Sequence, residues 1–516
     1  MSAPTTARAR PLVPLWAALL LAAAAGPVLD AAFPDLGWWP LAFIGIAMVL
    51  VAADGRRAGS GFLVGLVFGL SFYLIHIDWA TVFLGPIPWA ALSTLMALWC
   101  ALGTMLISIA TRVMPSAVRG PLGRLLFVPA VIAGLWTARE AVASVWPYGG
   151  FAWGRVALSQ SDSPISPLFA WLGISGVSFA MVLLVSTAIA AVRESRVPVL
   201  LRAALVTSLA AIMVAVPAWP TSSSDDFRVA AVQGNGKTGY FDPPEHAGDN
   251  LRSQIDATIP VLDSGADVIV WPEGASDLDP LRVPAAASAF DQISAEADAP
   301  LVAGTITARG DEYFNTSLLW RAGEGAVDYY DKRHPVPFGE YVPDRAIWRQ
   351  FAPDLIDLIQ REYTPGTTDM VLDIGSDGRS VLAGIAICFD IVDDAVMREA
   401  VGEGAQLILA QTNNADFGRT DESVQQLAIA RIRAIELGRT VVNISTVGTS
   451  AVILPDGRIS DQLTWYEADA MVADVPLETT TTPATVIGAG VERGVAAVGL
   501  GALIGASIAA ARRRRA

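Results

Sequence analysis

The pattern of apolar and polar residues along the chain predicts two kinds of region. Residues 1–220 and 487–511 are rich in Ala, Leu, Val and Trp, whereas residues 222–482 carry scattered Asp, Glu and Arg as a globular domain does. A helix that crosses a membrane needs roughly 20 apolar residues. The segments that approach this length are residues 11–29, 39–53, 60–76, 87–111, 123–145, 165–192, 198–218 and 487–511. The pattern predicts a domain of about seven membrane helices, a globular domain, and a last membrane helix before a basic tail at residues 512–516.

The charges of the loops predict the orientation of these helices. Arginines precede the first segment and follow the second, fourth, sixth and last segments, whereas the intervening loops carry aspartates and a single arginine, Arg155. The cationic positions are Arg8, Arg10, Arg56, Arg57, Arg112, Arg119, Arg124, Arg193, Arg196, Arg202 and Arg512 to Arg515. Because cytoplasmic loops are enriched in Lys and Arg, both termini are expected in the cytoplasm and residues 222–482 outside. A cleaved signal peptide is an alternative for the first segment, and it leaves the globular domain on the same side.

Composition narrows the class of protein. Hydrophobic residues make up 53% of the chain and charged residues 16%, which is too apolar for an ordinary soluble enzyme. The net charge of −15 argues against a nucleic-acid partner, because phosphates need cationic contacts. The two cysteines, Cys100 and Cys388, lie in an apolar segment and in the globular region, so neither a disulfide nor a zinc-binding spacing is indicated.

Two ionisable residues, Arg139 and Glu140, lie near the outer end of the fifth apolar segment. Such residues are costly in hydrocarbon and tend to mark a functional site, but an interfacial ion pair that reaches water is an equal alternative. The aromatic residues around them are typical of an interfacial belt, and could also frame an entry for lipid. These residues are Trp136, Trp146, Tyr148, Phe151 and Trp153.

The globular region alternates short apolar runs with segments of helical spacing, which favours an α/β fold with helices covering a sheet. Strands are predicted at Phe227–Gln233, Asp267–Trp271, Leu301–Ile306, Ser380–Ile387, Gln406–Gln411 and Thr440–Ser445. Helices are predicted at residues 248–263, 283–297, 391–402 and 421–437, and a hairpin turn at Asp456-Gly457.

Two reactive side chains directly follow predicted buried strands. Glu273, set between Pro272 and Gly274, is either a general base in a dry site or an ordinary acid in a turn. Cys388 follows the run Gly384 to Ile387 and is either a nucleophile, activated by a nearby carboxylate and ammonium, or a small buried core residue.

A loop stiffened by prolines and glycine carries Lys332, His334 and Glu340. Lys332 is either an oxyanion stabiliser or a surface lysine, and His334 is either a base or a hydrogen-bonding loop residue. Glu340 is placed to orient Lys332 or to line the site. The apolar residues of this loop form either a lid that dips into lipid or a part of the domain core, and they are Val336, Phe338, Tyr341, Val342, Trp348, Phe351 and Leu355.

Taken together, these segments resemble the nitrilase superfamily, whose members use a Glu-Lys-Cys catalytic set. The matching motifs are Trp271-Pro272-Glu273, Asp331-Lys332, Gly384 to Asp390, Thr412 to Gly418, Arg433 to Arg439 and Thr446 to Ser450. The resemblance implies an αββα sandwich in which Glu273 is the base, Lys332 the oxyanion stabiliser and Cys388 the nucleophile.

The arrangement of membrane segments before and after the globular region further resembles the apolipoprotein N-acyltransferase family. The motifs that carry this second resemblance are Lys332 to Pro343, Gly149 to Trp153, Ser159-Gln160 and Gly173 to Ser178. It implies a bacterial plasma-membrane enzyme that moves an acyl chain from a phospholipid, through a Cys thioester, to the N-terminal amine of a diacylglyceryl-cysteine apolipoprotein. No metal and no organic cofactor are implied.

The same resemblance implies supporting residues and shows departures from the family pattern. Glu340, Phe389 and Asp390 are expected to support the catalytic set, although the family often has tyrosine and glutamate at the last two positions. The expected substrate-side or lipid-side residues are Arg139, Glu140, Phe241, Phe338 and Tyr341. A family tryptophan is replaced here by Phe241.

Two other functions remain compatible with the sequence. A membrane-tethered amidase of the nitrilase type would hydrolyse its thioester with water. A membrane scaffold without catalysis would need none of the three catalytic positions, and their presence in order argues against it.

Overall fold

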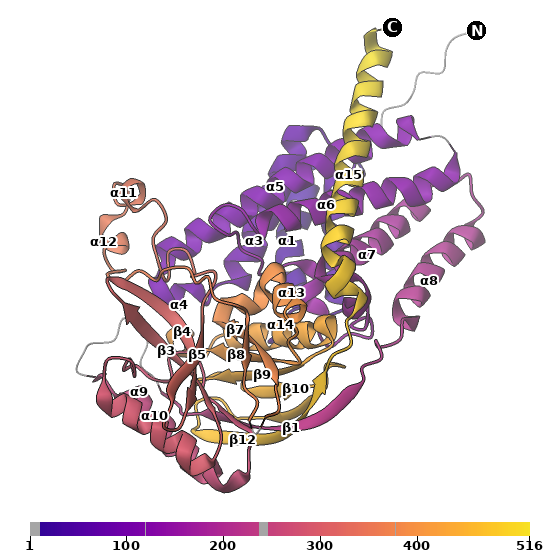
Figure 1. Ribbon diagram of the computed structural model, residues 1–516. Helices are drawn as coiled ribbons and strands as arrows, with labels where there is room; N and C mark the ends of the chain where they lie inside the picture. Colours follow the sequence, from indigo (N-terminus) through magenta and orange to yellow (C-terminus); the bar gives the residue numbers. More distant parts are fainter. Residues whose placement is uncertain (1–10, 119, 237–245, 377, 516) are drawn as a thin grey trace, which may run out of the picture. The chain divides into compact units, whose positions relative to one another are not determined.

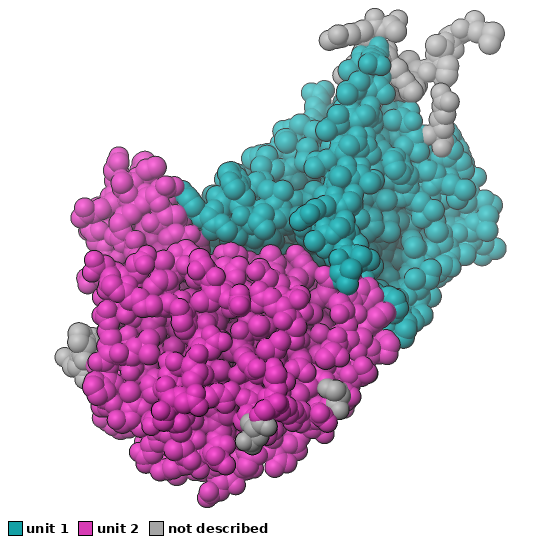
Figure 2. Space-filling model, in the orientation of Figure 1, with its two compact units in different colours: residues 1–218, 486–516 teal, residues 219–485 magenta. Residues whose placement is uncertain are grey.

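The chain is divided into two compact units in the computed structural model, which describes residues 11–118, 120–236, 246–376 and 378–515. Unit 1 comprises residues 1–218 and 486–516, and unit 2 comprises residues 219–485 (Figure 2). Unit 1 is helical, whereas unit 2 contains two β-sheets with helices on their outer faces (Figure 1).

Every predicted membrane segment contains a helix of unit 1. The helices are α1 (Leu15–Asp30), α2 (Leu41–Ala53), α3 (Ala58–His76), α4 (Ala80–Leu84), α5 (Pro86–Ala117), η1 (Gly123–Phe127), α6 (Val128–Ala143), η2 (Val156–Gln160), α7 (Leu168–Arg193), α8 (Val199–Ala215) and the greater part of α15 (Pro483–Arg515). Within the described residues, five helical segments are long and apolar enough to cross a membrane, and they include α3, α5, α7 and α15. The apolar helices α1, α2 and α8 are shorter.

The apolar side chains of unit 1 are not all buried inside it. Val199, Leu200 and Leu201 of α8 are exposed, as are Val486 and Ile504 of α15. A helix that is apolar all round and is left uncovered by protein is typical of a membrane-spanning segment, because lipid then covers its surface. The chain is therefore a membrane protein.

The first sheet of unit 2 has the strand order β12-β1-β2-β3-β4-β5. Its strands are β1 (Ser223–Gln233), β2 (Val268–Val270), β3 (Leu301–Arg309), β4 (Glu312–Arg321), β5 (Gly325–Asp331) and β12 (Asp469–Glu478). Strands β1, β2 and β3 are parallel, and β3, β4 and β5 are successively antiparallel. The carboxyl ends of β1, β2, β3 and β5 therefore lie at one edge of this sheet.

The second sheet has the order β11-β10-β9-β8-β7-β6. Its strands are β6 (Val371–Asp373), β7 (Leu382–Ile387), β8 (Leu407–Thr412), β9 (Thr440–Ser445), β10 (Ala451–Ile453) and β11 (Ile459–Gln462). Strands β7, β8 and β9 are parallel, so their carboxyl ends also share an edge.

Helices cover the outer face of each sheet and complete an αββα sandwich, which confirms the predicted fold class. On the first sheet these are α9 (Asp249–Thr258), η4 (Ile259–Ser264) and α10 (Pro284–Ala297), and on the second α13 (Asp394–Gly402) and α14 (Glu422–Leu437). Between β2 and α10 the core contains the edge-to-face pair Trp271 and Phe290, with ring centroids 5.3 Å apart. Such burial of large aromatic surface fixes the strand ends that follow it.

Candidate active site

Three predicted site residues follow strands at the carboxyl edges of the two sheets. Glu273 comes shortly after β2, Lys332 directly after β5, and Cys388 directly after β7. The amide of Gln411, near the end of β8, donates to the carbonyl oxygen of Trp271 at 2.6 Å, which ties the second sheet to the segment that carries Glu273. The topology thus brings together residues that lie far apart in the sequence, at the edge where α/β proteins place their ligands.

The Glu273 carboxylate is held by two donors from different sheets. Asn315 of β4 donates to Oε1 at 2.7 Å, and the backbone N–H of Asn413 donates to Oε2 at 2.9 Å. Gly304 of β3 makes room for this segment, since a Cβ there would lie 2.3 Å from the carbonyl oxygen of Pro272. The carboxylate is therefore fixed in position and almost fully buried.

Lys332 lies between two carboxylates. Its Nζ is 2.9 Å from Glu340 Oε2 and 3.9 Å from Glu273 Oε1, and its side chain is only 1% exposed. Asn315 also donates to Glu340 at 2.9 Å, so one amide bridges both acids. The site buries two carboxylates for one ammonium, which excludes the interpretation of Lys332 as a surface lysine.

Cys388 sits at a sharp turn between β7 and the 3-10 helix η5 (Cys388–Val392), with a left-handed φ of 51°. A residue other than glycine is strained in the left-handed region, so the surrounding structure must hold Cys388 in that conformation. The buried guanidinium of Arg433 does so by donating to the carbonyls of Ile391 and Val392 at 2.8 and 2.9 Å. The turn directs the thiol out of the strand.

The buried charges change the acidity of all three groups. Burial raises the pKa of Glu273 to about 7, assisted by Glu340 and opposed by Lys332. Burial alone would lower the pKa of Lys332, but Glu340 and Glu273 outweigh it and raise that pKa above its usual range. Burial, followed by the charge of Glu273, raises the pKa of the Cys388 thiol well above its usual value. The resting site therefore holds a thiol, an ammonium and a carboxyl group poised to accept a proton near neutral pH.

Asp390 lies beneath this turn. Its Oδ2 accepts from the backbone N–H of Ile387 at 3.1 Å and from the hydroxyl of Tyr330 at 2.9 Å. Burial raises the pKa of Asp390 to about 6. Asp390 thus ties the strand before Lys332 to the turn that carries Cys388, while the half-buried Phe389 separates it from Cys388 in the sequence.

Comparison with known proteins agrees with this geometry. Residues 25–187 match the family model described as apolipoprotein N-acyltransferase N-terminal domain, and residues 228–484 match carbon-nitrogen hydrolase. A protein named apolipoprotein N-acyltransferase from Mycolicibacterium smegmatis is 32% identical over 514 residues, covering 91% of this chain and 82% of that protein. The chain belongs to the apolipoprotein N-acyltransferase family.

More distant comparisons cover either nearly the whole chain or half of it. The apolipoprotein N-acyltransferase of Photobacterium profundum is 28% identical and covers 91% of each chain. Among solved structures, an amidase of the nitrilase superfamily from Nesterenkonia is 21% identical, covers 50% of this chain and 94% of its own, and has a TM-score of 0.37.

The loop after Lys332 in this member of the acyltransferase family is partly packed and partly exposed. Val342 is buried with Ile356 and Ile359, and the half-buried Phe338 packs against them. Phe338 also meets Trp348 edge to face, with ring centroids 5.5 Å apart.

By contrast Phe351, between the short helices α11 (Arg345–Trp348) and α12 (Pro353–Ile356), is 77% exposed. Tyr341 pairs with Pro337 across the base of the loop. Part of the loop therefore packs into the domain as one interpretation expected, and the lid that dips into lipid stays a prediction for its exposed residues.

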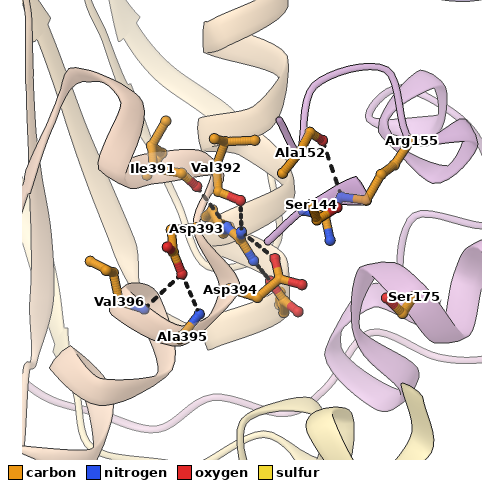
Figure 3. A network of polar contacts seen from close by, with 12 residues as sticks. Ser144, Ala152, Arg155, Ser175, Ile391, Val392, Asp393, Asp394, Ala395 and Val396 are labelled. Atoms are coloured by element: carbon orange, nitrogen blue, oxygen red, sulfur yellow. Dashed lines mark hydrogen bonds and ion pairs between the residues drawn. The ribbon is translucent and has the colours of Figure 1, made fainter. Parts of the chain in front are cut away.

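His334 is a hydrogen-bonding residue of this loop. Its Nδ1 is 2.9 Å from Asp393, and the pKa of His334 is raised chiefly by that hydrogen bond. Asp393 in turn accepts from the backbone N–H groups of Ala395 and Val396, which caps α13 (Figure 3). His334 thus anchors the loop to a helix terminus.

The lipid-side candidates Arg139 and Glu140 belong to unit 1, where both are buried. Glu140 accepts from the indole of Trp136 at 2.9 Å, from the backbone N–H of Val156 at 3.1 Å and from Arg139 at 3.4 Å. Protein donors inside the unit surround Glu140, and this contact pattern does not favour the alternative of an interfacial pair that reaches water. Phe241 lies outside the described residues.

The sequence analysis missed the amides that surround the three central groups. Asn315 of β4 bridges the two carboxylates, and Gln426 of α14 donates to the Cys388 sulfur at 3.7 Å. No local sequence pattern marked Asn315 as a site residue, because strand β4 was not predicted. For Gln426 a weak signal existed, since it lies on the predicted helix 421–437 one turn after an acid, Glu422.

Proposed function

We propose that the chain transfers an acyl chain from a membrane phospholipid to the N-terminal amine of diacylglyceryl-cysteine apolipoproteins. The observation that carries the proposal is the Cys388 thiol, held on a strained backbone and grouped with the buried Glu273–Lys332–Glu340 cluster. The other unit of the chain is built of membrane helices. The family membership supports the same reaction.

In the first half-reaction, Glu273 takes the proton of the Cys388 thiol and the thiolate attacks the ester carbonyl of the phospholipid. The negative charge that develops on the carbonyl oxygen is stabilised by the Lys332 ammonium. Collapse of the tetrahedral intermediate breaks the ester bond, Glu273 returns the proton to the leaving alkoxide, and lysophospholipid departs. A thioester on Cys388 remains.

In the second half-reaction, the α-amine of the lipidated cysteine attacks the thioester. Glu273 takes the excess proton of the amine, Lys332 again stabilises the oxyanion, and the Cys388 thiolate is expelled and reprotonated. A base whose pKa is about 7 can both accept and return a proton at neutral pH, which suits this two-way role.

The membrane unit supports the choice of a lipid substrate. With the cationic loops in the cytoplasm, both termini lie inside and unit 2 lies outside, where lipoproteins are exposed. The exposed Ile347, Phe351 and Leu358 give the loop after Lys332 an apolar tip suited to contact with lipid. A soluble amide substrate would need neither feature.

The proposal is tested on the lipoproteins of a strain that lacks the gene. Mass spectrometry of a lipoprotein N-terminus should show loss of one acyl chain on deletion, and recovery with the intact gene or with Cys100→Ala, since Cys100 lies buried in unit 1. Cys388→Ala should fail to restore the mass. Unchanged N-acylation after deletion would overturn the proposal. Labelled phospholipid that leaves no acyl chain on Cys388 of the purified chain would favour the amidase.

A further inference from the structure

A second cluster of buried polar side chains, which the proposed chemistry does not use, borders the thiol. It consists of Glu422 and Gln426 of α14, Asn414 after β8, and Ser445 at the end of β9, and none of them is more than 2% exposed. We infer that Gln426 is a further catalytic residue that stabilises the Cys388 thiolate through a hydrogen bond, and that Asn414 and Glu422 are positioning residues for its amide. This inference rests on the proposed role of Cys388 as the nucleophile.

In each hydrogen bond of the cluster, the other bonds of the two groups determine which group donates and which accepts. The backbone N–H of Gly448 donates to Ser445 Oγ at 2.9 Å, so the Ser445 hydroxyl is left to donate to Asn414 Oδ1. The amide nitrogen of Asn414 then donates to Glu422 at 2.6 Å and to the side-chain oxygen of Gln426 at 2.9 Å. Because the oxygen of Gln426 accepts that bond, its NH₂ group faces the sulfur of Cys388, 3.7 Å away.

The backbone at Gly448 leaves room for the side chains of the cluster. A Cβ on Gly448 would lie 2.2 Å from Asn414 Oδ1 and 2.5 Å from the hydroxyl of Ser423. Any other residue at position 448 would displace Asn414 and with it the amide of Gln426. The chain thus places glycine where the close approach of Asn414 requires it.

A neutral donor has a distinct effect on a thiol that is surrounded by acids. Glu273, Glu340 and Glu422 all raise the pKa of Cys388, and Lys332 alone among the charged neighbours lowers it. An N–H donor favours the charged form of its partner without adding a charge. The hydrogen bond from Gln426 therefore strengthens when the sulfur becomes a thiolate. This happens before acylation, and again when the amine displaces the Cys388 thiolate from the thioester. The bond thus stabilises the transition states more than the resting thiol.

Glu422 fits this role because burial raises its pKa to about 8. At neutral pH it is mostly protonated, so it gives Asn414 a partner without placing a full negative charge beside the thiolate. Glu422→Gln preserves this arrangement, and it is the matched control for any loss of Gln426.

The test is the pH dependence with which iodoacetamide alkylates the purified full chain in detergent. The Cys100→Ala background leaves Cys388 as the single thiol, because the chain has two cysteines. Gln426→Leu should slow alkylation at pH 7 about fivefold and raise the midpoint of the profile by about 0.7 pH unit, as expected for the loss of one hydrogen bond. Glu422→Gln should leave the midpoint in place or lower it.

A second variant keeps the test decisive if Gln426→Leu does not fold. Gln426→Glu has the same shape and still accepts from Asn414, but it faces the sulfur with an oxygen, so its midpoint should rise further than that of Gln426→Leu. Midpoints equal to the parent in the folded variants, even with a lowered melting temperature, would overturn the inference. That result would leave the proposed function intact. N-acylation by Cys388→Ala would overturn the role of Cys388 as the nucleophile, and unchanged N-acylation after gene deletion would overturn the function itself.

Discussion

The ion pair Arg139–Glu140 of unit 1 and the cluster Glu273–Lys332–Glu340 of unit 2 both bury charge, but they balance it differently. In unit 1 one acid meets one base from the adjacent position of the same helix, and Glu140 also accepts from an indole and a backbone N–H. In unit 2 two acids and one ammonium come from two segments, one after β2 and one after β5, and the amide of Asn315 on β4 bridges the acids.

The difference distinguishes charges that stabilise the fold, in unit 1, from charges with the proposed catalytic role, in unit 2. The unit 1 pair has one acid for one base, and the bond from the Val156 N–H to Glu140 Oε1 fixes the helix against the segment at Val156. In unit 2 burial raises the pKa of Glu273 to about 7, and the second acid, Glu340, adds to that shift against the opposing charge of Lys332. Four experiments test this distinction, in order of decreasing expected effect.

Lys332→Met should have the largest effect. It removes the oxyanion stabiliser and leaves two buried carboxylates without their cation, so acyl transfer should fall by about 10³-fold or more. Arg333→Met is the matched control, because its partner Glu399 is largely exposed and its loss should change activity by less than about twofold. Activity is measured as transfer of a labelled acyl chain to a diacylglyceryl peptide, per folded protein.

Glu340→Gln should change the pH profile as well as the rate. With one carboxylate fewer around Lys332, the pKa of Glu273 should fall from about 7, because Glu340 is one of the groups that raise it. Activity requires the deprotonated base and therefore rises with pH, so the acid limb of kcat/KM should move to lower pH, by about one unit. An acid limb that stays in place would show that the excess of acid does not set the pKa of Glu273.

Replacements of Glu140 separate a structural from a chemical role in unit 1. Glu140→Ala leaves the Trp136 indole and the Val156 N–H without their acceptor and should lower the melting temperature by several degrees, whereas Glu140→Gln keeps an acceptor oxygen and should lower it less. Folded Glu140→Gln should retain most of its acyl transfer. A loss beyond about 100-fold at unchanged melting temperature would place Glu140 in the chemistry and remove the distinction between the two units.

Glu422→Gln should give the smallest effect on activity, and its main effect should be on the pH dependence of stability. The carboxyl group is neutral when buried and its pKa is raised to about 8, so its contribution to stability is complete at acid pH and is lost as the pH rises toward and through 8. The variant has no charge to bury, so its melting temperature relative to the parent should be higher at pH 9 than at pH 5, by about 5 °C or more. A constant difference across this range would show that Glu422 is ionised in the folded protein.

Much of this architecture could be predicted from the sequence, because its signals are local. The apolar segments correspond to helices, the predicted strands became β1, β2, β3, β7, β8 and β9, and the turn at Asp456-Gly457 joins β10 to β11. Strand β12 was missed, since its pattern alternates exposed and buried residues beside β1 rather than forming a continuous apolar run. Strands β4 and β5 were also missed: the buried run of β4 contains the polar residues Asn315, Thr316 and Ser317, and β5 exposes Val327, Asp328 and Tyr329.

The candidate site could be predicted only in part, because its neighbours are set by tertiary structure. Motifs pointed to Glu273, Lys332 and Cys388, but nothing local indicated that Asn315 would face two acids or that Gln426 would reach the sulfur. Those contacts depend on the register of β4 and on the face that α14 presents to η5. The burial of Arg139 and Glu140 likewise depends on donors that lie on a segment after their own helix.

The most direct test of the account is to trap the acyl-enzyme. The purified chain is incubated with phospholipid that carries isotope-labelled acyl chains, without an acceptor, and its peptides are analysed by mass spectrometry. The account predicts one labelled acyl group on Cys388, which hydroxylamine releases and a diacylglyceryl-cysteine peptide removes as an amide. Label on another residue, or continued transfer to the peptide by Cys388→Ala, would contradict it.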